Sequence, residues 1–275
     1  KTTSFQSWSR QLQEFANSPA LLAEIPYWHA LDRLRIPKLP VDKIETPDYA
    51  NQHIGTVWGR LPKEVTADLL SGAHRAYQTE MNDLLLSGLV MTLNGWTHGK
   101  VAVQLEGHGR EEVIDGVDLT RTVGWFTSMY PVVFEQDSKD PDEVIPYVKE
   151  VLRQVPNKGI GYGILKYLTR PEHKQDLSFR LKPEINFNYQ GEFVRDVEKK
   201  DIQIVSLPVG EGVHPLTQWP YKLDFSLFVE NGELVTLIRY HQTLYHRETM
   251  EQLKNLYLHH LKRIVDVCRE KVLVK

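Results

Sequence analysis

The sequence predicts a mixed α/β fold of the layered α+β kind, and three observations support this prediction. Helical and strand-like segments alternate along the chain, but without the regular strand-helix-strand rhythm of a parallel sheet. The sequence contains neither an internal repeat nor a low-complexity tract. Its 275 residues, of which 41% are hydrophobic, are enough to bury a large core. We therefore expect helices packed in layers on a sheet.

The beginning of the chain is predicted to be helical. Residues 4–19 carry large apolar side chains at helical spacing, with Ser4 or Thr3 as the N-cap. A second, short helix is expected within residues 19–31. Three prolines within eleven residues follow in the segment 35–49, which favours an extended connector and predicts a boundary between lobes.

Strands and helices then follow in an order that hydrophobic periodicity and turn residues indicate. Asp140 and Pro141 are suited to begin a helix, and Asn231-Gly232 is the two-residue turn of a hairpin. The predicted strand segments are 53–61, 101–106, 124–135 with its leading loop, 183–193, 201–209 and the hairpin 221–242. The predicted helices are 62–77, 82–98, 140–155, 159–168 and 247–270. The last helix carries one apolar stripe, which we expect to pack on the sheet.

Composition and charge argue against several classes of protein. The net charge is -3 and no cluster of Lys and Arg stands out, which disfavours nucleic-acid binding. No apolar run approaches the roughly 20 residues that span a bilayer, and the first residues lack the apolar region of a signal peptide. We therefore expect no membrane association and a cytoplasmic location. The single cysteine, Cys268, lies on the stripe of the last helix, which predicts a buried hydrophobic side chain rather than a nucleophile.

The stretch VAVQLEGHGREEV, residues 101–113, concentrates groups that can transfer protons. Strand alternation places Glu106 on the face of the strand opposite its apolar side chains, and His108 and Arg110 would share that face if the strand continued. Such a carboxylate can act as a general base, with a pKa set by burial and by the neighbouring cation. Gly107 and Gly109 would let a substrate or a backbone approach closely. Spacing alone leaves this function open against an ordinary Glu-Arg pair at a solvated strand end.

Other chemistries find less support in the sequence. The pattern E-x-H-x-R offers two metal ligands, whereas a catalytic zinc usually has three. GHGREE and GIGYGI lack the context of a dinucleotide site, and neither a G-x-S-x-G elbow nor a P-loop occurs. His259-His260 lies inside the last helix, and we interpret this pair as structural. By pattern alone, Asn188, Tyr189 and Asp224 stay open between functional and ordinary sheet positions.

Three motifs occur in order along the chain: EGHGREE at 106–112, RTVGWFTSMYPV at 121–132 and NFNYQGEF at 186–193. With the opening KTTSFQSWSRQLQEFANS, they resemble the motif series of epimerization domains of non-ribosomal peptide synthetases, close to those ending the initiation modules of tyrocidine and gramicidin synthetases. The resemblance covers essentially the whole chain. Related condensation domains lack EGHGRE and typically replace the Gly-Trp-Phe of the second motif, so the resemblance favours epimerization.

The resemblance implies a two-lobed fold similar to chloramphenicol acetyltransferase, with a tunnel where the lobes meet. The implied partner is a peptidyl carrier protein domain, upstream in the same polypeptide. Its 4'-phosphopantetheine arm would present an aminoacyl or peptidyl thioester for conversion from L to D in antibiotic synthesis. No cofactor is expected to bind directly, and no metal is expected.

Residue by residue, the resemblance implies that Glu106 is the acid/base group, while Asn188 and Tyr189 contact substrate or relay protons. The remaining implied residues would hold Glu106 in place or line the path of the pantetheine arm: His108, Arg110, Trp125, Thr127 and Ser128.

One family motif is missing from this sequence. The HHxxxDG motif, whose second histidine is the other catalytic group in the family, does not occur. We therefore expect residues 1–45 to be the end of the N-terminal lobe and its connector, and residues 46–275 to be the C-terminal lobe. The missing N-terminal half would be a further partner, and the chain alone would be catalytically incomplete. Two alternatives stay open: a condensation-type acyltransferase domain and a non-catalytic module that docks carrier protein.

Overall fold

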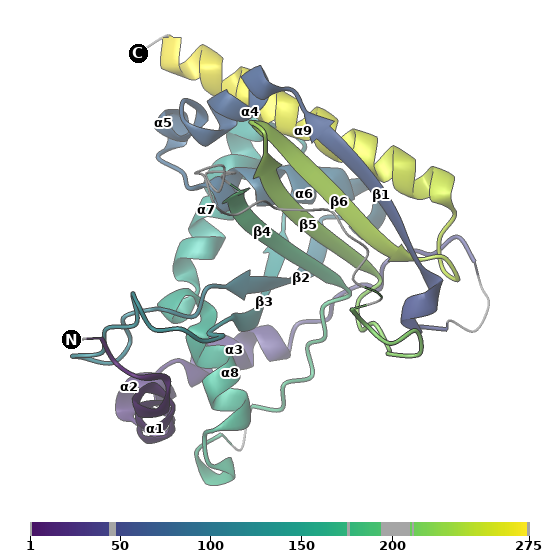
Figure 1. Ribbon diagram of the computed structural model, residues 1–275. Helices are drawn as coiled ribbons and strands as arrows, with labels where there is room; N and C mark the ends of the chain where they lie inside the picture. Colours follow the sequence, from purple (N-terminus) through teal and green to yellow (C-terminus); the bar gives the residue numbers. More distant parts are fainter. Residues whose placement is uncertain (1, 44–47, 175–176, 194–209, 211, 274–275) are drawn as a thin grey trace.

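A six-stranded mixed β-sheet forms the centre of the protein (Figure 1). The computed structural model describes residues 2–43, 48–174, 177–193, 210 and 212–273. The strands are β1 (Ile54–Leu61), β2 (Lys100–Gly107), β3 (Ser128–Glu135), β4 (Ile185–Phe193), β5 (Leu223–Glu230) and β6 (Glu233–His241). Their order in the sheet is β1-β6-β5-β4-β2-β3. β4 pairs in parallel with β2 and with β5, and the other pairs are antiparallel.

Helices lie on one face of this sheet and at its β3 end (Figure 1). The α-helices are α1 (Phe5–Phe15), α2 (Pro19–Leu22), α3 (Ile25–Asp32), α4 (Lys63–Leu70), α5 (Ala73–Tyr77), α6 (Met81–Thr97), α7 (Pro141–Gln154), α8 (Ile160–Tyr167) and α9 (Arg247–Leu273). Short 3-10 helices are η1 (Asn51–His53), η2 (Pro156–Gly159) and η3 (Pro171–His173). This arrangement confirms the predicted mixed α/β layers.

The core lies between the sheet and helices α6 and α9. Phe225 of β5 meets Tyr257 of α9 edge to face, with ring centroids 5.6 Å apart. The Tyr257 hydroxyl donates to the Leu85 carbonyl of α6 at 3.1 Å. Gly88 permits the close approach of the two helices, because a Cβ there would lie 2.6 Å from Leu261. The apolar stripe of the last helix therefore packs as predicted, and Cys268 is buried on it.

Local sequence signals set several boundaries. Ser4 caps α1, Asp140 caps α7, and Asn231 and Gly232 both have positive φ in the turn between β5 and β6, as the sequence predicts. The helix expected over 62–77 is divided into α4 and α5 at Ser71, whose backbone is not helical. The strand expected at 201–209 lies outside the described residues. The lobe boundary expected after residue 45 stays a prediction.

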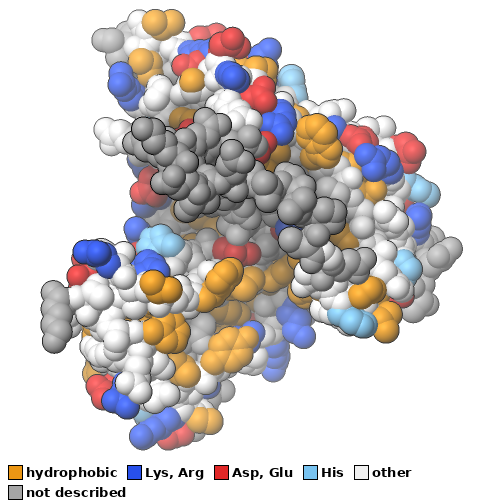
Figure 2. All heavy atoms as spheres, viewed as in Figure 1, with side chains coloured by type: hydrophobic (Ala, Val, Ile, Leu, Met, Phe, Trp, Pro, Cys, Tyr) orange, Lys and Arg blue, Asp and Glu red, His pale blue; other side chains and the backbone are white. Residues whose placement is uncertain are grey.

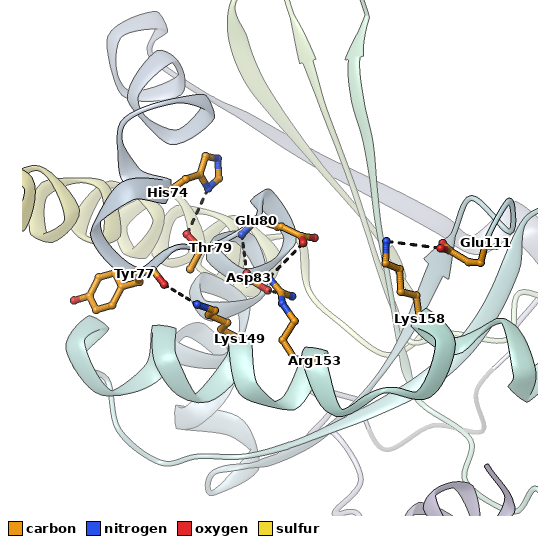
Figure 3. Close-up of polar contacts among 9 residues, drawn as sticks. All are labelled: His74, Tyr77, Thr79, Glu80, Asp83, Glu111, Lys149, Arg153 and Lys158. Carbon is orange, nitrogen blue, oxygen red and sulfur yellow. Dashed lines mark hydrogen bonds and ion pairs between the residues drawn. The ribbon is translucent and has the colours of Figure 1, made fainter. Parts of the chain in front are cut away.

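A polar cluster fixes the start of α6 against α7 (Figure 3). The buried Asp83 carboxylate accepts hydrogen bonds from both terminal nitrogens of Arg153, at 3.2 and 2.8 Å. It also accepts from the Glu80 backbone N–H at 2.7 Å, which completes a capping box. Lys149 of α7 donates to the Tyr77 carbonyl at 2.9 Å. The cluster therefore joins α5, α6 and α7 on the helical side of the sheet.

The first three helices join the same core at the β3 end. The Glu24 carboxylate is buried there and accepts from Trp28 Nε1 at 2.9 Å and from Asn157 Nδ2 at 2.7 Å. Burial raises the pKa of Glu24, and these two hydrogen bonds oppose the increase. The Trp28 ring also packs against Tyr162 of α8, with centroids 5.0 Å apart. This packing places α1–α3 beside the ends of β2 and β3.

Candidate functional site

Polar side chains cross four adjacent strands on the face of the sheet opposite α6 and α9. Strand alternation turns the apolar residues of these strands toward the helices and the intervening residues toward this second face. One line of paired positions across the sheet is Gln104, Asn186, Asp224 and Arg239, and the next positions along three of these strands are Glu106, Asn188 and Ser226. The sheet register thus gathers amide, carboxyl and guanidinium groups in one place.

Glu106, at the end of β2, is held by two asparagines of β4. Asn188 Nδ2 donates to Glu106 Oε2 at 2.8 Å, and Asn186 Nδ2 donates to Oε1 at 3.2 Å. Each carboxylate oxygen therefore receives one amide hydrogen, and the carboxyl plane is fixed by the neighbouring strand. Of the residues singled out in the sequence, Glu106 and Asn188 are brought into direct contact.

Asn186 also connects Glu106 to a second carboxyl group, Asp224 of β5. Its Nδ2 donates to Asp224 Oδ1 at 3.1 Å. Asp224 is only 2% exposed, and Arg239 Nε of β6 lies 3.4 Å from its Oδ2. Burial raises the pKa of Asp224, whereas the charge of Arg239 and the hydrogen bonds from Asn186 and Ser226 lower it. Asp224 is therefore part of the polar face and not a solvated hairpin residue.

Arg239 completes the row of polar groups. Its Nη2 donates to Ser226 Oγ at 3.2 Å, and its guanidinium carbon lies 5.2 Å from the centre of the Trp219 ring. The sequence reading singled out neither Arg239 nor Asn186. The available signal was the polar residue at alternate positions of NFN and of LDFS, which shows that these strands have one polar face.

Tyr189 lies apart from this row. It pairs with Leu227 of β5 in the register that turns side chains toward the helices, and it is half buried against the core. Burial raises the pKa of Tyr189, with a smaller contribution from Glu192. Of the two adjacent residues proposed from NFNYQG, the described contacts bring Asn188, and not Tyr189, to Glu106.

His108 and Arg110 also lie apart from Glu106, because β2 ends at Gly107. Gly109 has a positive φ, and a side chain there would collide with the Phe126 carbonyl, so the chain turns away from the strand direction. Arg110 donates to the carbonyls of Leu119 and of Thr122, the latter at 2.9 Å, and its guanidinium lies over the Phe126 ring.

The remaining contacts of this turn also point away from the Glu106 carboxylate. His108 Nε2 lies 3.2 Å from Glu111 Oε1, and Lys158 approaches the other oxygen of Glu111 at 3.7 Å (Figure 3). The expectation that His108 and Arg110 hold Glu106 is therefore corrected: among the described contacts, they organise the loop between β2 and β3.

Thr127 and Ser128 line a cavity of about 370 Å³ beside β2. Gln104 of the polar row, Met129 and three tyrosines share this lining. One of them is Tyr221, whose pKa is raised to about 12 by burial and, to a smaller extent, by the charges of Glu106 and Asp224. Ser128 Oγ is buried without a hydrogen-bond partner among the described residues. The cavity is therefore adjacent to the Glu106 end of the polar face.

Trp125 lies on the outside of the loop and is 85% exposed. Figure 2 shows hydrophobic side chains gathered on this side of the molecule, over the region of α1, α8 and β3. The large exposed apolar residues of this region are Phe5, Val123, Trp125, Met129, Tyr167 and Leu168. Trp125 belongs to this exposed apolar surface and does not line the cavity of Thr127 and Ser128.

The described part of the chain contains no cluster of three or more His, Cys, Asp or Glu side chains that could hold a metal ion. Within the same residues, none of the helices is long and apolar enough to cross a membrane. His260 is buried on the stripe of α9, where burial lowers its pKa to about 4. Its ring lies on the helical side of the sheet, away from the polar face.

Two known proteins are similar to this chain over nearly its full length. Surfactin synthase subunit 1 of Bacillus subtilis (strain 168) is 42% identical over 273 residues, which are 98% of this chain and 8% of that protein. Tyrocidine synthase 1 of Brevibacillus parabrevis is 40% identical over 98% of this chain and 26% of its own length. The chain therefore spans a small part of each of these relatives.

Solved structures agree with the observed fold. The crystal structure of the epimerization domain from the third module of tyrocidine synthetase B superposes with a TM-score of 0.92 at 40% identity, covering 98% of this chain and 61% of that one. The condensation domain of a Monacolin K polyketide synthase has a TM-score of 0.69 at 14% identity, covering 96% of this chain and 62% of its own, and shares the fold alone. A model of the condensation domain family matches residues 1–273. The chain belongs to the condensation domain family.

Proposed function

We propose that this chain is part of an epimerization domain of a non-ribosomal peptide synthetase. Its substrate is an aminoacyl or peptidyl thioester on the 4'-phosphopantetheine arm of a peptidyl carrier protein, and the reaction inverts the Cα from L to D. The observation that carries the proposal is the Glu106 carboxylate, oriented by Asn186 and Asn188 beside the cavity that Thr127 and Ser128 line. The similarity to a solved epimerization domain supports the same function.

The chemistry requires a base that removes one proton and an acid that returns one to the opposite face. A thioester makes its Cα–H acidic, so a positioned carboxylate can accept that proton while negative charge develops on the thioester oxygen. Glu106 takes the proton, and the enolate is reprotonated at Cα with no net change of atoms or charge. The two amide donors keep the carboxylate in one orientation during the transfer.

The pantetheine arm needs a path to Glu106. The cavity beside β2 is lined by side chains that can form hydrogen bonds with the amides of the arm. Among them are Gln104, Thr127 and the Ser128 hydroxyl, which has no hydrogen-bond partner among the described residues. We assign Thr127 and Ser128 to this path. We assign Trp125, which is on the exposed apolar surface, to contacts with the carrier protein instead of the arm.

A condensation-type acyltransferase is the second candidate, since the family model and several relatives describe condensation domains or whole synthetases in general. The two functions differ in their product. An epimerase exchanges the Cα proton with solvent on a single carrier, whereas an acyltransferase forms an amide with a second carrier-bound amine.

The deciding experiment replaces Glu106 by Gln in the complete domain, joined to its carrier protein loaded with an aminoacyl thioester. We expect solvent deuterium incorporation at Cα to fall by at least about 100-fold, because the amide of Gln cannot accept the proton. Glu112→Gln, at an exposed position of the same motif, is the matched control and should exchange at the normal rate. Carrier binding, measured by calorimetry, should be the same in all three proteins.

Two results would contradict this proposal. Normal exchange in the Glu106→Gln variant would remove Glu106 from the chemistry. Amide formation with a second carrier, without exchange at Cα in the unmodified domain, would favour the acyltransferase.

A further inference from the structure

We propose that Asp224 is a positioning residue for Glu106, acting through the side-chain amide of Asn186. This inference rests on the proposed function, because it assigns to Asp224 and Arg239 a part in orienting the proposed base. Neither residue belongs to the motifs by which the chain resembles epimerization domains.

The Asn186 amide bridges two carboxylates. Its NH2 group has two hydrogens, and the two oxygens within reach are Glu106 Oε1 at 3.2 Å and Asp224 Oδ1 at 3.1 Å. An acceptor on each side requires that the nitrogen, and not the carbonyl oxygen, faces both carboxylates. Asp224 therefore fixes the orientation of the amide that Glu106 receives.

The charges along the row of polar side chains also favour this arrangement. In the register of the sheet, Asp224 on β5 lies between Asn186 on β4 and Arg239 on β6. Arg239, with Nε 3.4 Å from Asp224 Oδ2, favours the ionised form of Asp224 despite its burial. The charged Asp224 carboxylate therefore anchors the same Asn186 amide that holds Glu106 Oε1.

The hydrogen bonding of this network is incomplete. Asn186 Oδ1 and Arg239 Nε are buried without hydrogen-bond partners among the described residues. Buried polar groups with open hydrogen-bonding capacity are costly in a purely structural network. Both atoms belong to the row of polar groups that also holds Glu106. These unmet hydrogen bonds lower the stability of the fold, which indicates that the network serves to position Glu106.

The test is Asp224→Asn in the complete, carrier-linked domain, compared with Asp68→Asn. Asp68 is a matched control, because it also pairs with an arginine, Arg269, but on the helical side of the sheet. We expect Cα-deuterium exchange to fall by about 10- to 100-fold in Asp224→Asn and to stay unchanged in Asp68→Asn. With the loaded carrier supplied as a separate protein, the loss should fall on kcat and leave KM unchanged, because Asp224 orients the base without contacting the substrate.

A second variant keeps the test valid if Asp224→Asn does not fold, which thermal unfolding would reveal. Asn186→Leu is close in size to asparagine but lacks the bridging donor, and it should reduce exchange to a similar extent. Unchanged exchange in a folded variant, or a loss that falls on KM and leaves kcat unchanged, would overturn the positioning role. Absence of exchange in the unmodified domain would instead overturn the proposed function, and this inference with it.

Discussion

Two carboxylate-arginine pairs in this protein are similar in composition and different in construction. Asp83 and Arg153 lie on the helical side of the sheet, where both terminal nitrogens of Arg153 and one backbone N–H satisfy the Asp83 carboxylate. Asp224 and Arg239 lie on the polar face, where the closest contact is 3.4 Å and Arg239 Nε has no hydrogen-bond partner among the described residues. The saturated pair joins helices, whereas the unsaturated pair lies in the polar row that also holds Glu106.

This difference predicts a role in stability for Asp83 and Arg153, and it agrees with the proposed role of Asp224 in orienting Glu106. A bidentate pair with a further backbone donor offsets much of the cost of burying two charges. A pair held by one long contact offsets less of the cost of burying its charges. Its polar atoms can still form hydrogen bonds with neighbouring groups. Substitutions at the two pairs should therefore affect different measurements.

The largest effect on stability is expected for Arg153→Leu. The variant leaves the Asp83 carboxylate buried without its guanidinium, so the free energy of unfolding should fall by about 3 kcal/mol. Urea unfolding of the complete domain measures this change, and Arg153→Lys, which keeps one charge-assisted contact, should lose less. If the free energy of unfolding falls by less than about 1 kcal/mol in Arg153→Leu, the Asp83-Arg153 pair does not contribute to stability as its contacts indicate.

A smaller effect, dependent on pH, is expected for Asp224→Asn. Burial raises the pKa of Asp224 in the folded protein above its usual value of 3.8. The contribution of Asp224 to stability is therefore fully present below pH 3.8 and is lost as the pH rises through the raised pKa. Asparagine has no such loss, so the stability of the variant relative to the unmodified domain should increase between pH 4 and pH 7. If the difference in free energy of unfolding between the variant and the unmodified domain is the same at pH 4 and at pH 7, the raised pKa of Asp224 is contradicted.

The smallest effect is expected for Asp68→Asn. Asp68 and Arg269 are both partly exposed, so solvent screens their attraction and the loss should stay below about 1 kcal/mol. Urea unfolding at low and at high salt measures it, and the difference between the variant and the unmodified domain should shrink as salt increases. A loss as large as that of Arg153→Leu would show that exposure does not distinguish these pairs.

Much of the fold could be predicted from local sequence. Alternation identified β2 and β4, and the Asn231-Gly232 turn identified the β5-β6 hairpin. The apolar stripe identified α9 as a helix that packs on the sheet. The break between α4 and α5 was missed, since Ser71-Gly72 interrupts a periodic pattern that otherwise reads as one helix. Periodicity reports which face of an element is apolar, but a single non-helical residue hardly changes it.

The candidate site was predicted less completely. Glu106 and Asn188 were recognised from motifs, and the structure joins them directly. Arg110 was expected beside Glu106 by extending the strand, but Gly109 turns the chain and Arg110 binds the loop instead. Asn186 was missed although it lies two residues from Asn188, because no local pattern tells which polar strand residue will meet a carboxylate.

The sequence by itself determined the alternating strands, the capped helices, the hairpin turn and the motifs of the family, since each depends on residues close together in the chain. Only the tertiary structure decided that β4 lies between β2 and β5, which brings Asn186 between Glu106 and Asp224. The physical reason is that parallel neighbours in a sheet come from distant parts of the chain, and their register is set by packing of the whole apolar face against α6 and α9.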